Sequence, residues 1–297
     1  MFLNRKKEMK SKKVNSAILL MYSPDKKGLV AAVTKFLAAN NGNILFLEQH
    51  VDSQEKAFFM RIEWDLDKFK IPRDNIGNIF NKQVAAKFKM KWQLYFSDVP
   101  PKMAIFVSKF PHCLYDILSR MESGDYNVEI PLIISNHQEI REIAQKFNID
   151  FYYFDKNNRN RKIQEKAELK LLKDHNIDFV VLARYMQVLS NDFIKKYPDK
   201  IINIHHSFLP AFAGARPYHS AYKRGVKIIG ATSHYVTDAL DAGPIIEQDV
   251  IRVSHADRVS DMVRKGQDLE KVVLSRAIWY HLMRKTMVYK NRVIVFN

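Results

Sequence analysis

Short apolar runs alternate with helical segments between residues 103 and 205, and this alternation constrains the fold more than any other feature. The apolar runs predict strands over 103–108, 128–135, 150–154, 178–183 and 200–205. Helical spacing predicts helices over 112–121, 137–147 and 164–173, with another near 191–197. Repeated units of this kind predict a doubly wound, mostly parallel, Rossmann-like sheet. Such sheets bind ligands at the carboxyl ends of their strands.

The residues before this block follow a different order. Strands are expected over 16–22, 43–51, 56–64 and 91–96, and helices after Ser23-Pro24-Asp25 and over 72–87. This βαββαβ order predicts a ferredoxin-like domain. Pro100 and Pro101 cannot lie inside a helix or a central strand, so they mark a linker. The expected parts are a basic tail (1–15), a ferredoxin-like domain (16–97), a linker (98–102) and a second α/β domain (103–297).

Charge and cysteine content exclude several classes of protein. The formal net charge is +16, but no zinc-ligand spacing or aromatic RNA-binding motif accompanies it, so no nucleic-acid partner is expected. A positive field equally suits a small anionic substrate. The single cysteine, Cys113, rules out an intramolecular disulfide framework and fits the cytoplasm. The apolar runs are too short to span a membrane, so no membrane partner is expected. The tail 1–15 is read as a solvated segment, with an anion-binding arm as the alternative.

The densest group of polar residues follows the isoleucines at 201–202. The period of two along a strand places Asn203 and His205 on one face. A later loop, 237–244, carries two carboxylates, Asp238 and Asp241, before a Gly-Pro turn. An Asn can donate to a developing oxyanion, a His can move a proton and an Asp can orient it, so this set suits acyl transfer. The alternative is that Asn203 and His205 merely cap the end of a strand.

Longer motifs surround these residues. They are Asn203-Ile204-His205, Leu209-Pro210, His234-Tyr235-Val236-Thr237-Asp238 and Leu240-Asp241-Ala242-Gly243-Pro244. With them the chain resembles the folate-dependent formyltransferases. It is most similar to the formyltetrahydrofolate deformylase family, on Val107-Ser108-Lys109, His112-Cys113-Leu114, Ser135-Asn136-His137, Leu182-Ala183-Arg184-Tyr185-Met186, 203–222 and 266–276. The resemblance covers residues 103–297 and implies the formyltransferase fold.

The resemblance implies a hydrolase that converts 10-formyltetrahydrofolate and water to formate and tetrahydrofolate, balancing the folate pool and supplying formate for purine synthesis. It implies that Asn203 stabilises the tetrahedral oxyanion, His205 stabilises the same charge and acts as the acid, and Asp241 orients His205 and positions or deprotonates water. No metal or other cofactor is expected. The implied substrate-binding residues are Arg184, Tyr185, Met186, Val188, Leu189, Ser207, His234, Val236, Thr237 and Asp238. His206 is open between a water-holding role and a structural hydrogen bond.

Residues 16–97 resemble the ACT regulatory domain, through Pro24-Asp25, Gly28-Leu29-Val30 and Asn43-Ile44. This resemblance implies a small effector, such as glycine or methionine, held where two copies of the domain meet. The effector-binding residues would be Asp25, Gly28, Leu29, Asn43 and Ile44. The protein would then be a homo-oligomer, either a dimer or a tetramer.

Two other functions remain open. A glycinamide ribonucleotide formyltransferase would use the same three catalytic residues, but its phosphate-binding loop is rich in glycine. The matching segment here, 108–114, contains no glycine, and Phe110-Pro111 would block the backbone groups that close on a phosphate. An amino-acid-sensing protein without catalysis is the second alternative, although Asn203, His205 and Asp241 are all present.

Overall fold

The computed structural model describes residues 15–155, 161–210 and 217–297. The chain divides into two compact units, one reaching to Val99 and including Phe296–Asn297, and the other running from Pro100 to Val295. The basic tail expected over 1–15 lies outside the described residues apart from Asn15. Within the described ranges, no helix combines the length and the apolar character needed to cross a membrane.

The first unit contains a four-stranded antiparallel sheet in the order β2-β3-β1-β4. Its main elements are β1 (Ser16–Pro24), α1 (Leu29–Ala39), β2 (Asn43–Asp52), β3 (Ala57–Asp65) and β4 (Lys91–Phe96). The helix expected over 72–87 is a series of pieces, in which a 3-10 turn (Arg73–Asn75), α2 (Ile76–Phe80), a π-helical turn (Asn81–Ala85) and α3 (Ala86–Phe88) follow one another. The βαββαβ prediction is confirmed.

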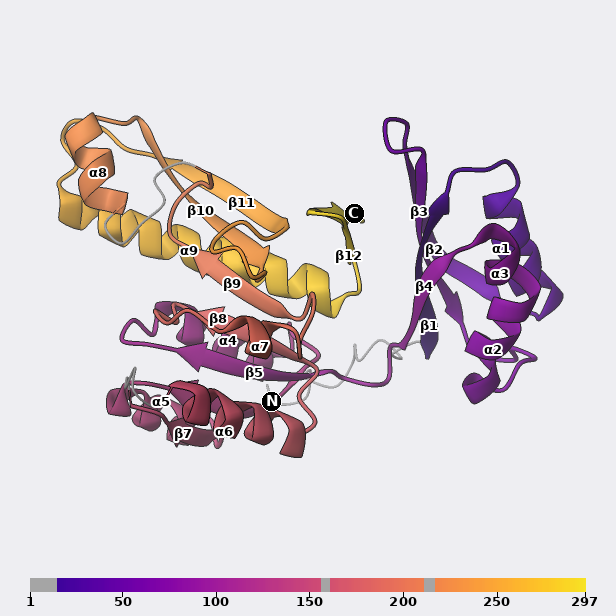
Figure 1. The fold of residues 1–297 in the computed structure, drawn as a ribbon, viewed down its shortest axis with the longest axis horizontal. Helices are drawn as coiled ribbons and strands as arrows, with labels where there is room; N and C mark the ends of the chain where they lie inside the picture. Colours follow the sequence, from indigo (N-terminus) through magenta and orange to yellow (C-terminus); the bar gives the residue numbers. More distant parts are fainter. Residues whose placement is uncertain (1–14, 156–160, 211–216) are drawn as a thin grey trace, which may run out of the picture. The chain divides into compact units, whose positions relative to one another are not determined.

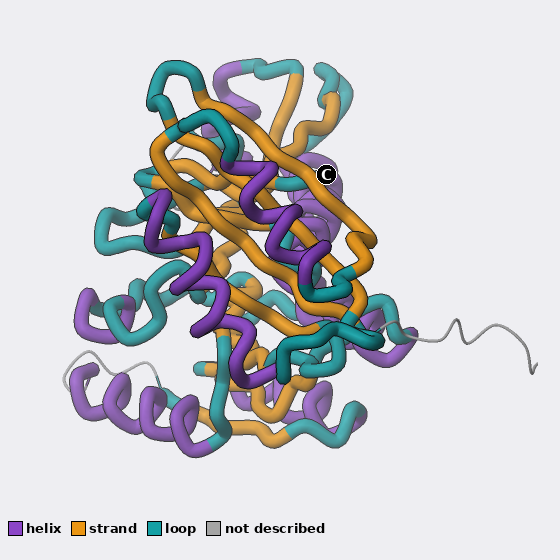
Figure 2. Tube along the Cα trace, turned by 90° about the vertical axis from the view of Figure 1, so that its right-hand side faces the viewer, coloured by secondary structure: helices purple, strands orange, loops and turns teal. Residues whose placement is uncertain are grey.

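Both helical segments of this unit lie across the same face of its sheet (Figure 2). The rings of Phe36 on α1 and Phe80 on α2 meet edge to face with their centroids 5.4 Å apart. They share one apolar core with Leu19, Met60 and Trp64 of the sheet. The period-two strands and the helices therefore bury one common apolar layer.

The second unit contains a seven-stranded sheet in the order β11-β10-β9-β8-β5-β6-β7 (Figure 1). The five strands from β9 to β7 are parallel, whereas β10 is antiparallel to both of its neighbours. The mostly parallel, doubly wound prediction is thus confirmed. The strands are β5 (Lys102–Val107), β6 (Glu129–Ser135), β7 (Asp150–Tyr153), β8 (Phe179–Ala183), β9 (Ile201–His205), β10 (Ile228–Tyr235), β11 (Ile245–Arg252) and the separate hairpin β12 (Thr286–Tyr289) and β13 (Arg292–Val295).

Helices cover both faces of this sheet. They are α4 (His112–Ser123), a 3-10 turn (Gln138–Ile140), α5 (Arg141–Lys146), α6 (Arg161–Asp174), α7 (Asn191–Ile194), α8 (Pro217–Arg224) and α9 (Val259–Leu282). Helices α4, α5 and α9 share one apolar core with the sheet, while α6 and α7 share another. Figure 1 shows α9 running along β9, β10 and β11, against which it packs.

The two cores fix the direction in which β9 presents its side chains. Ile202 and Ile204 belong to the core of α4, α5 and α9, and Ile201 belongs to the core of α6 and α7. Alternation along the strand therefore turns Asn203 and His205 to the same side as Ile201. The shared face predicted for these two residues is confirmed.

Candidate active site

A cavity of about 340 Å³ lies where β8 and β9 end, between the loop that follows β8 and the loop that follows β10. Most of the predicted substrate residues and all three predicted catalytic residues line it. These are Arg184, Tyr185, Met186, Val188, Leu189, Asn203, His205, His234, Val236, Thr237, Asp238 and Asp241. Gln187, Ala239 and Leu240 also line the cavity, between predicted residues of the same two loops. Leu182, Ile194 and Ile204 line it as well and were not predicted.

His205 and Asp241 form a histidine–carboxylate pair in this cavity. His205 Nδ1 lies 3.3 Å from Asp241 Oδ2, and the two side chains are 8% and 22% exposed. This contact with His205 is the main reason why the pKa of Asp241 is lowered, although partial burial acts in the opposite direction. His205 Nε2 is buried and makes no hydrogen bond with any described group. Asp241 thus holds Nδ1 of His205, and Nε2 remains available to transfer a proton.

Asn203 is oriented by His234 on the neighbouring strand. Its Nδ2 lies 3.2 Å from His234 Nε2, while His234 Nδ1 lies 3.0 Å from the Tyr235 carbonyl oxygen. A carbonyl only accepts, so Nδ1 carries the proton and Nε2 accepts from the Asn203 amide. Burial, the largest influence, lowers the pKa of His234 and keeps it neutral. One Asn203 N–H is therefore occupied, and the other remains to meet an oxyanion.

His206 also lines the cavity, and it stacks on His205 with the ring centroids 5.3 Å apart. Burial lowers its pKa to about 4, and the nearby Arg184 cation lowers it further than the Glu270 carboxylate raises it. His206 is therefore neutral at physiological pH. It supplies a neutral imidazole directly beside the His205–Asp241 pair.

A second histidine–carboxylate pair involves the helices that flank the sheet. Glu270 on α9 is 1% exposed, and its Oε2 accepts from His112 Nε2 at 2.7 Å and lies 3.4 Å from Arg184 Nε. Glu270 Oε1 accepts from the Tyr218 hydroxyl at 2.9 Å. Burial alone would raise the pKa of Glu270, but the contacts with His112 and Arg184 lower it below its ordinary value. We call His112, Arg184, Tyr218 and Glu270 the Glu270 cluster.

The Glu270 cluster does not suit a metal ion. His112, Cys113 and Glu270 place their ligand atoms within 4.8 Å of one another, the one such group in the described chain. However, Arg184 brings a positive charge to the same carboxylate. Burial also raises the pKa of the Cys113 thiol well above its ordinary value, which opposes the thiolate that a metal requires.

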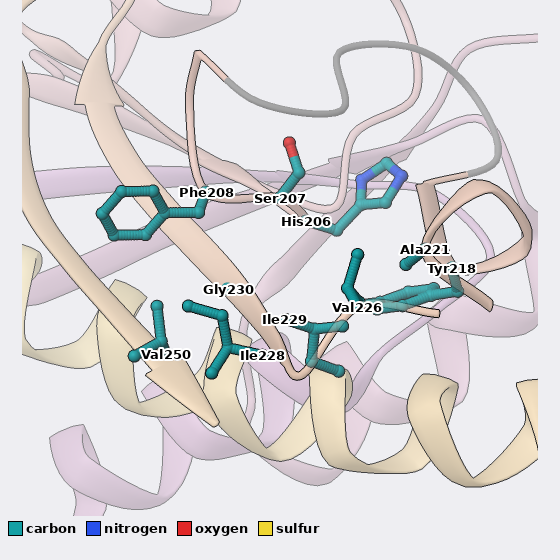
Figure 3. Close-up of a pocket in the computed structure, with 10 residues that line it drawn as sticks. All are labelled: His206, Ser207, Phe208, Tyr218, Ala221, Val226, Ile228, Ile229, Gly230 and Val250. Atoms are coloured by element: carbon teal, nitrogen blue, oxygen red, sulfur yellow. The ribbon is translucent and has the colours of Figure 1, made fainter. Parts of the chain in front are cut away.

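Ser207 was predicted to contact substrate, but it lies outside the wall of the catalytic cavity. It borders a neighbouring cavity of about 180 Å³ lined mainly by apolar side chains (Figure 3). In Figure 3 the Ser207 hydroxyl and the His206 ring extend away from Ile228 and Val250 of that cavity. The Ser207 hydroxyl is buried and has no hydrogen-bond partner among the described residues.

Two glycines allow the close packing around both histidine–carboxylate pairs. A Cβ atom on Gly243 would lie 1.8 Å from the Tyr235 carbonyl oxygen, so only glycine fits two residues after Asp241. A Cβ atom on Gly266 would lie 2.0 Å from the Tyr218 hydroxyl, which would push that hydroxyl away from Glu270.

The predicted effector residues are not brought together within one copy of the first unit. Asp25 and Gly28 follow the end of β1 that pairs with Ala57, whereas Asn43 and Ile44 lie near Asp65. These are opposite ends of β3, about 26 Å apart at the usual rise per residue. Gly28 has a φ of 89° and precedes α1, whose first residue, Leu29, is buried.

Comparisons with known proteins cover both units. The formyl transferase family matches residues 101–278, and the ACT domain family matches residues 17–68. The chain is 52% identical to a formyltetrahydrofolate deformylase from Synechocystis over 95% of this chain and 98% of that protein. The crystal structure of a formyltetrahydrofolate deformylase from Pseudomonas syringae matches with a TM-score of 0.94 and 41% identity, covering 97% of this chain and 96% of that one.

A glycinamide ribonucleotide transformylase from Symbiobacterium toebii is less similar. Its crystal structure matches with a TM-score of 0.64 and 27% identity, covering 69% of this chain and 98% of that one. The full-length similarity is thus to proteins that join both units. The chain belongs to the formyltetrahydrofolate deformylase family.

Proposed function

We propose that the protein hydrolyses 10-formyltetrahydrofolate to formate and tetrahydrofolate. The observation that carries this proposal is the His205–Asp241 pair, set beside an oriented Asn203 in one cavity. The full-length similarity to formyltetrahydrofolate deformylases supports the choice of substrate. The pterin would lie against the loop 184–189 and the loop 236–241, which border the same cavity.

In the proposed reaction a water oxygen bonds to the formyl carbon, and the formyl oxygen becomes an oxyanion. The free N–H of Asn203 and a protonated His205 stabilise that charge, and Asp241 holds the His205 ring through Nδ1. Collapse of the intermediate breaks the bond between carbon and N10, and His205 gives N10 its proton. The attacking water loses two protons through Asp241, of which one returns to His205 and the other is released, so that the products are tetrahydrofolate, formate and one proton.

Two features of the second unit favour water over an amine acceptor. The segment 108–114 contains no glycine, and its His112 is tied to Glu270. His206, held neutral, can accept a hydrogen bond from water beside His205. A glycinamide ribonucleotide formyltransferase is the alternative, and a regulatory protein without catalysis is disfavoured by the intact catalytic set.

The deciding assay uses the purified full chain with 10-formyltetrahydrofolate and no amine acceptor, following formate and tetrahydrofolate. We expect turnover that does not increase when glycinamide ribonucleotide is added. Turnover that appears only with the ribonucleotide would instead establish a formyltransferase. Physiologically, the proposed activity would balance the folate pool and supply formate for purine synthesis, in the cytoplasm.

The ACT domain is proposed to bind an amino acid such as glycine or methionine between two copies of the chain. Asp25 and Gly28 of one copy could then meet Asn43 and Ile44 of another, since one copy keeps them apart. Strand β2 lies at the edge of its sheet and exposes Leu45 at 43%. An exposed apolar edge of this kind favours association, so a dimer or tetramer is proposed.

A further inference from the structure

Among the charged side chains that line the cavity, Arg184 has the most buried polar atoms without a hydrogen-bond partner. Its side chain is 10% exposed, and neither Nε nor Nη1 makes a hydrogen bond with any described group. A guanidinium carries five N–H donors, and a buried donor without a partner is costly. Its backbone φ of 61° adds strain that a glycine in this position would avoid. An acceptor with oxygen atoms is therefore what this side chain needs.

The Glu270 carboxylate does not supply the hydrogen-bond acceptors that the Arg184 guanidinium lacks. Its Oε2 is shared between His112 and Arg184, with Arg184 at the longer distance of 3.4 Å, and its Oε1 is taken by Tyr218. The two-pronged pairing that arginine makes with a free carboxylate is thus not formed. At His206, which stacks on His205, the Arg184 cation lowers the pKa by more than the Glu270 carboxylate raises it.

Arg184 also borders the same cavity as the reacting groups. The cavity wall includes Arg184, His205 and His206, and His206 stacks on His205. His205 Nε2 is a further buried polar atom without a partner among the described residues, and it becomes a second donor here when His205 is protonated. A small anion with two oxygens has the matching chemistry.

We propose that Arg184 binds the carboxylate of formate, the product released beside the catalytic three. This inference rests on the proposed hydrolysis. Before the reaction the formyl group is neutral and has one oxygen, whereas after cleavage the same carbon carries two oxygens and a negative charge at neutral pH. The guanidinium can pair with both oxygens of the product but not of the substrate. Arg184 thus distinguishes product from substrate by charge.

The test measures formate binding directly, so it does not depend on turnover. Carbon-13 formate is titrated into the tetrahydrofolate-bound full chain and followed by NMR, with sodium chloride at equal ionic strength as the blank. Arg184→Met is expected to weaken formate binding roughly 10- to 100-fold, the loss typical of a charged hydrogen-bonded pair. Glu270→Gln removes the competing negative charge and keeps an acceptor for Tyr218, so it is expected to tighten formate binding.

Matched variants control for folding and for charge. Arg276→Met removes another cation of this unit, one that is 51% exposed and paired with Asp249, and should leave formate affinity unchanged. If Arg184→Met fails to fold, the double variant Arg184→Met with Glu270→Gln removes both buried charges together and should show the same weakening. Tetrahydrofolate affinity reports on whether the cavity is intact in each variant.

The outcomes separate this inference from the proposed function. Unchanged formate affinity in a folded Arg184 variant overturns the formate site, even if the wild type hydrolyses its substrate. Formate that binds through Arg184 in a protein without hydrolysis overturns the proposed function and the role of formate as its product. Equal displacement by chloride at matched ionic strength would also contradict a carboxylate site.

Discussion

The His205–Asp241 and His112–Glu270 pairs both lie in the second unit, and they differ in which polar atoms they leave without a partner. In the His205–Asp241 pair the atoms are 3.3 Å apart, the carboxylate is 22% exposed, and His205 Nε2 has no described partner. In the His112–Glu270 pair they are 2.7 Å apart, and the carboxylate is 1% exposed with contacts to Tyr218 and Arg184. The open pair is suited to moving protons, whereas the closed pair holds α4, α8 and α9 together.

The largest expected effect separates the two pairs by activity. Asp241→Asn should lower kcat by about 10³- to 10⁴-fold, because the imidazolium of His205 loses its counter-charge. Asn tolerates the left-handed conformation of residue 241, whose φ is 54°, so stability should change little. Steady-state kinetics and a thermal melt measure the two quantities. Asp174→Asn, at an exposed carboxylate paired with Lys170, is the control. Undiminished kcat would remove Asp241 from the mechanism.

The next effect concerns stability. Glu270→Ala should lower the free energy of unfolding by about 3–5 kcal/mol, since it leaves Arg184 as a buried charge without its counter-ion. Urea denaturation measures this loss for the Glu270→Ala variant and for the double variant that combines Arg184→Met and Glu270→Gln. The double variant should be the more stable of the two. If Glu270→Ala kept its stability and lost as much kcat as Asp241→Asn, the distinction between an open and a closed pair would fail.

The smallest effect lies at His206, between the two pairs. Its pKa of about 4 is set mainly by burial and next by Arg184. The unfolded imidazole titrates near 6.5, so this group should cost stability progressively as the pH falls from 6.5 to about 4. In Arg184→Met the pKa of His206 should rise, because the second cause is removed. NMR titration of the imidazole measures it, and a pKa that stays the same or falls would show that Arg184 does not act on His206.

Sequence alone predicted the open pair far better than the closed one. Alternation along β9 was enough to place Asn203 and His205 on one face, whereas the loop before Gly243-Pro244 offered both Asp238 and Asp241, and the family resemblance selected Asp241. The closed pair joins residues 158 positions apart, on helices whose facing sides depend on packing. No local pattern distinguishes Glu270 from the other charged residues of α9.

The effector site stays a prediction, because pairing with β3 places Asp25 and Asn43 at opposite ends of the sheet and the site requires two copies of the chain. The end of a strand limited another prediction. Ser207 lies beyond the last residue of β9, where the alternation of the strand no longer fixes its direction. The π-helical turn at Asn81–Ala85 likewise interrupts a helix whose apolar spacing alone suggested continuity.

The contact at Gly243 has a consequence for mutational surveys of this protein. Any side chain there would meet the Tyr235 carbonyl oxygen at 1.8 Å, regardless of its polarity or size. In a library that samples every amino acid at each position, all nineteen replacements at 243 should therefore show the same low activity. Such a position marks the background level of the assay, against which partial losses elsewhere in the cavity can be graded.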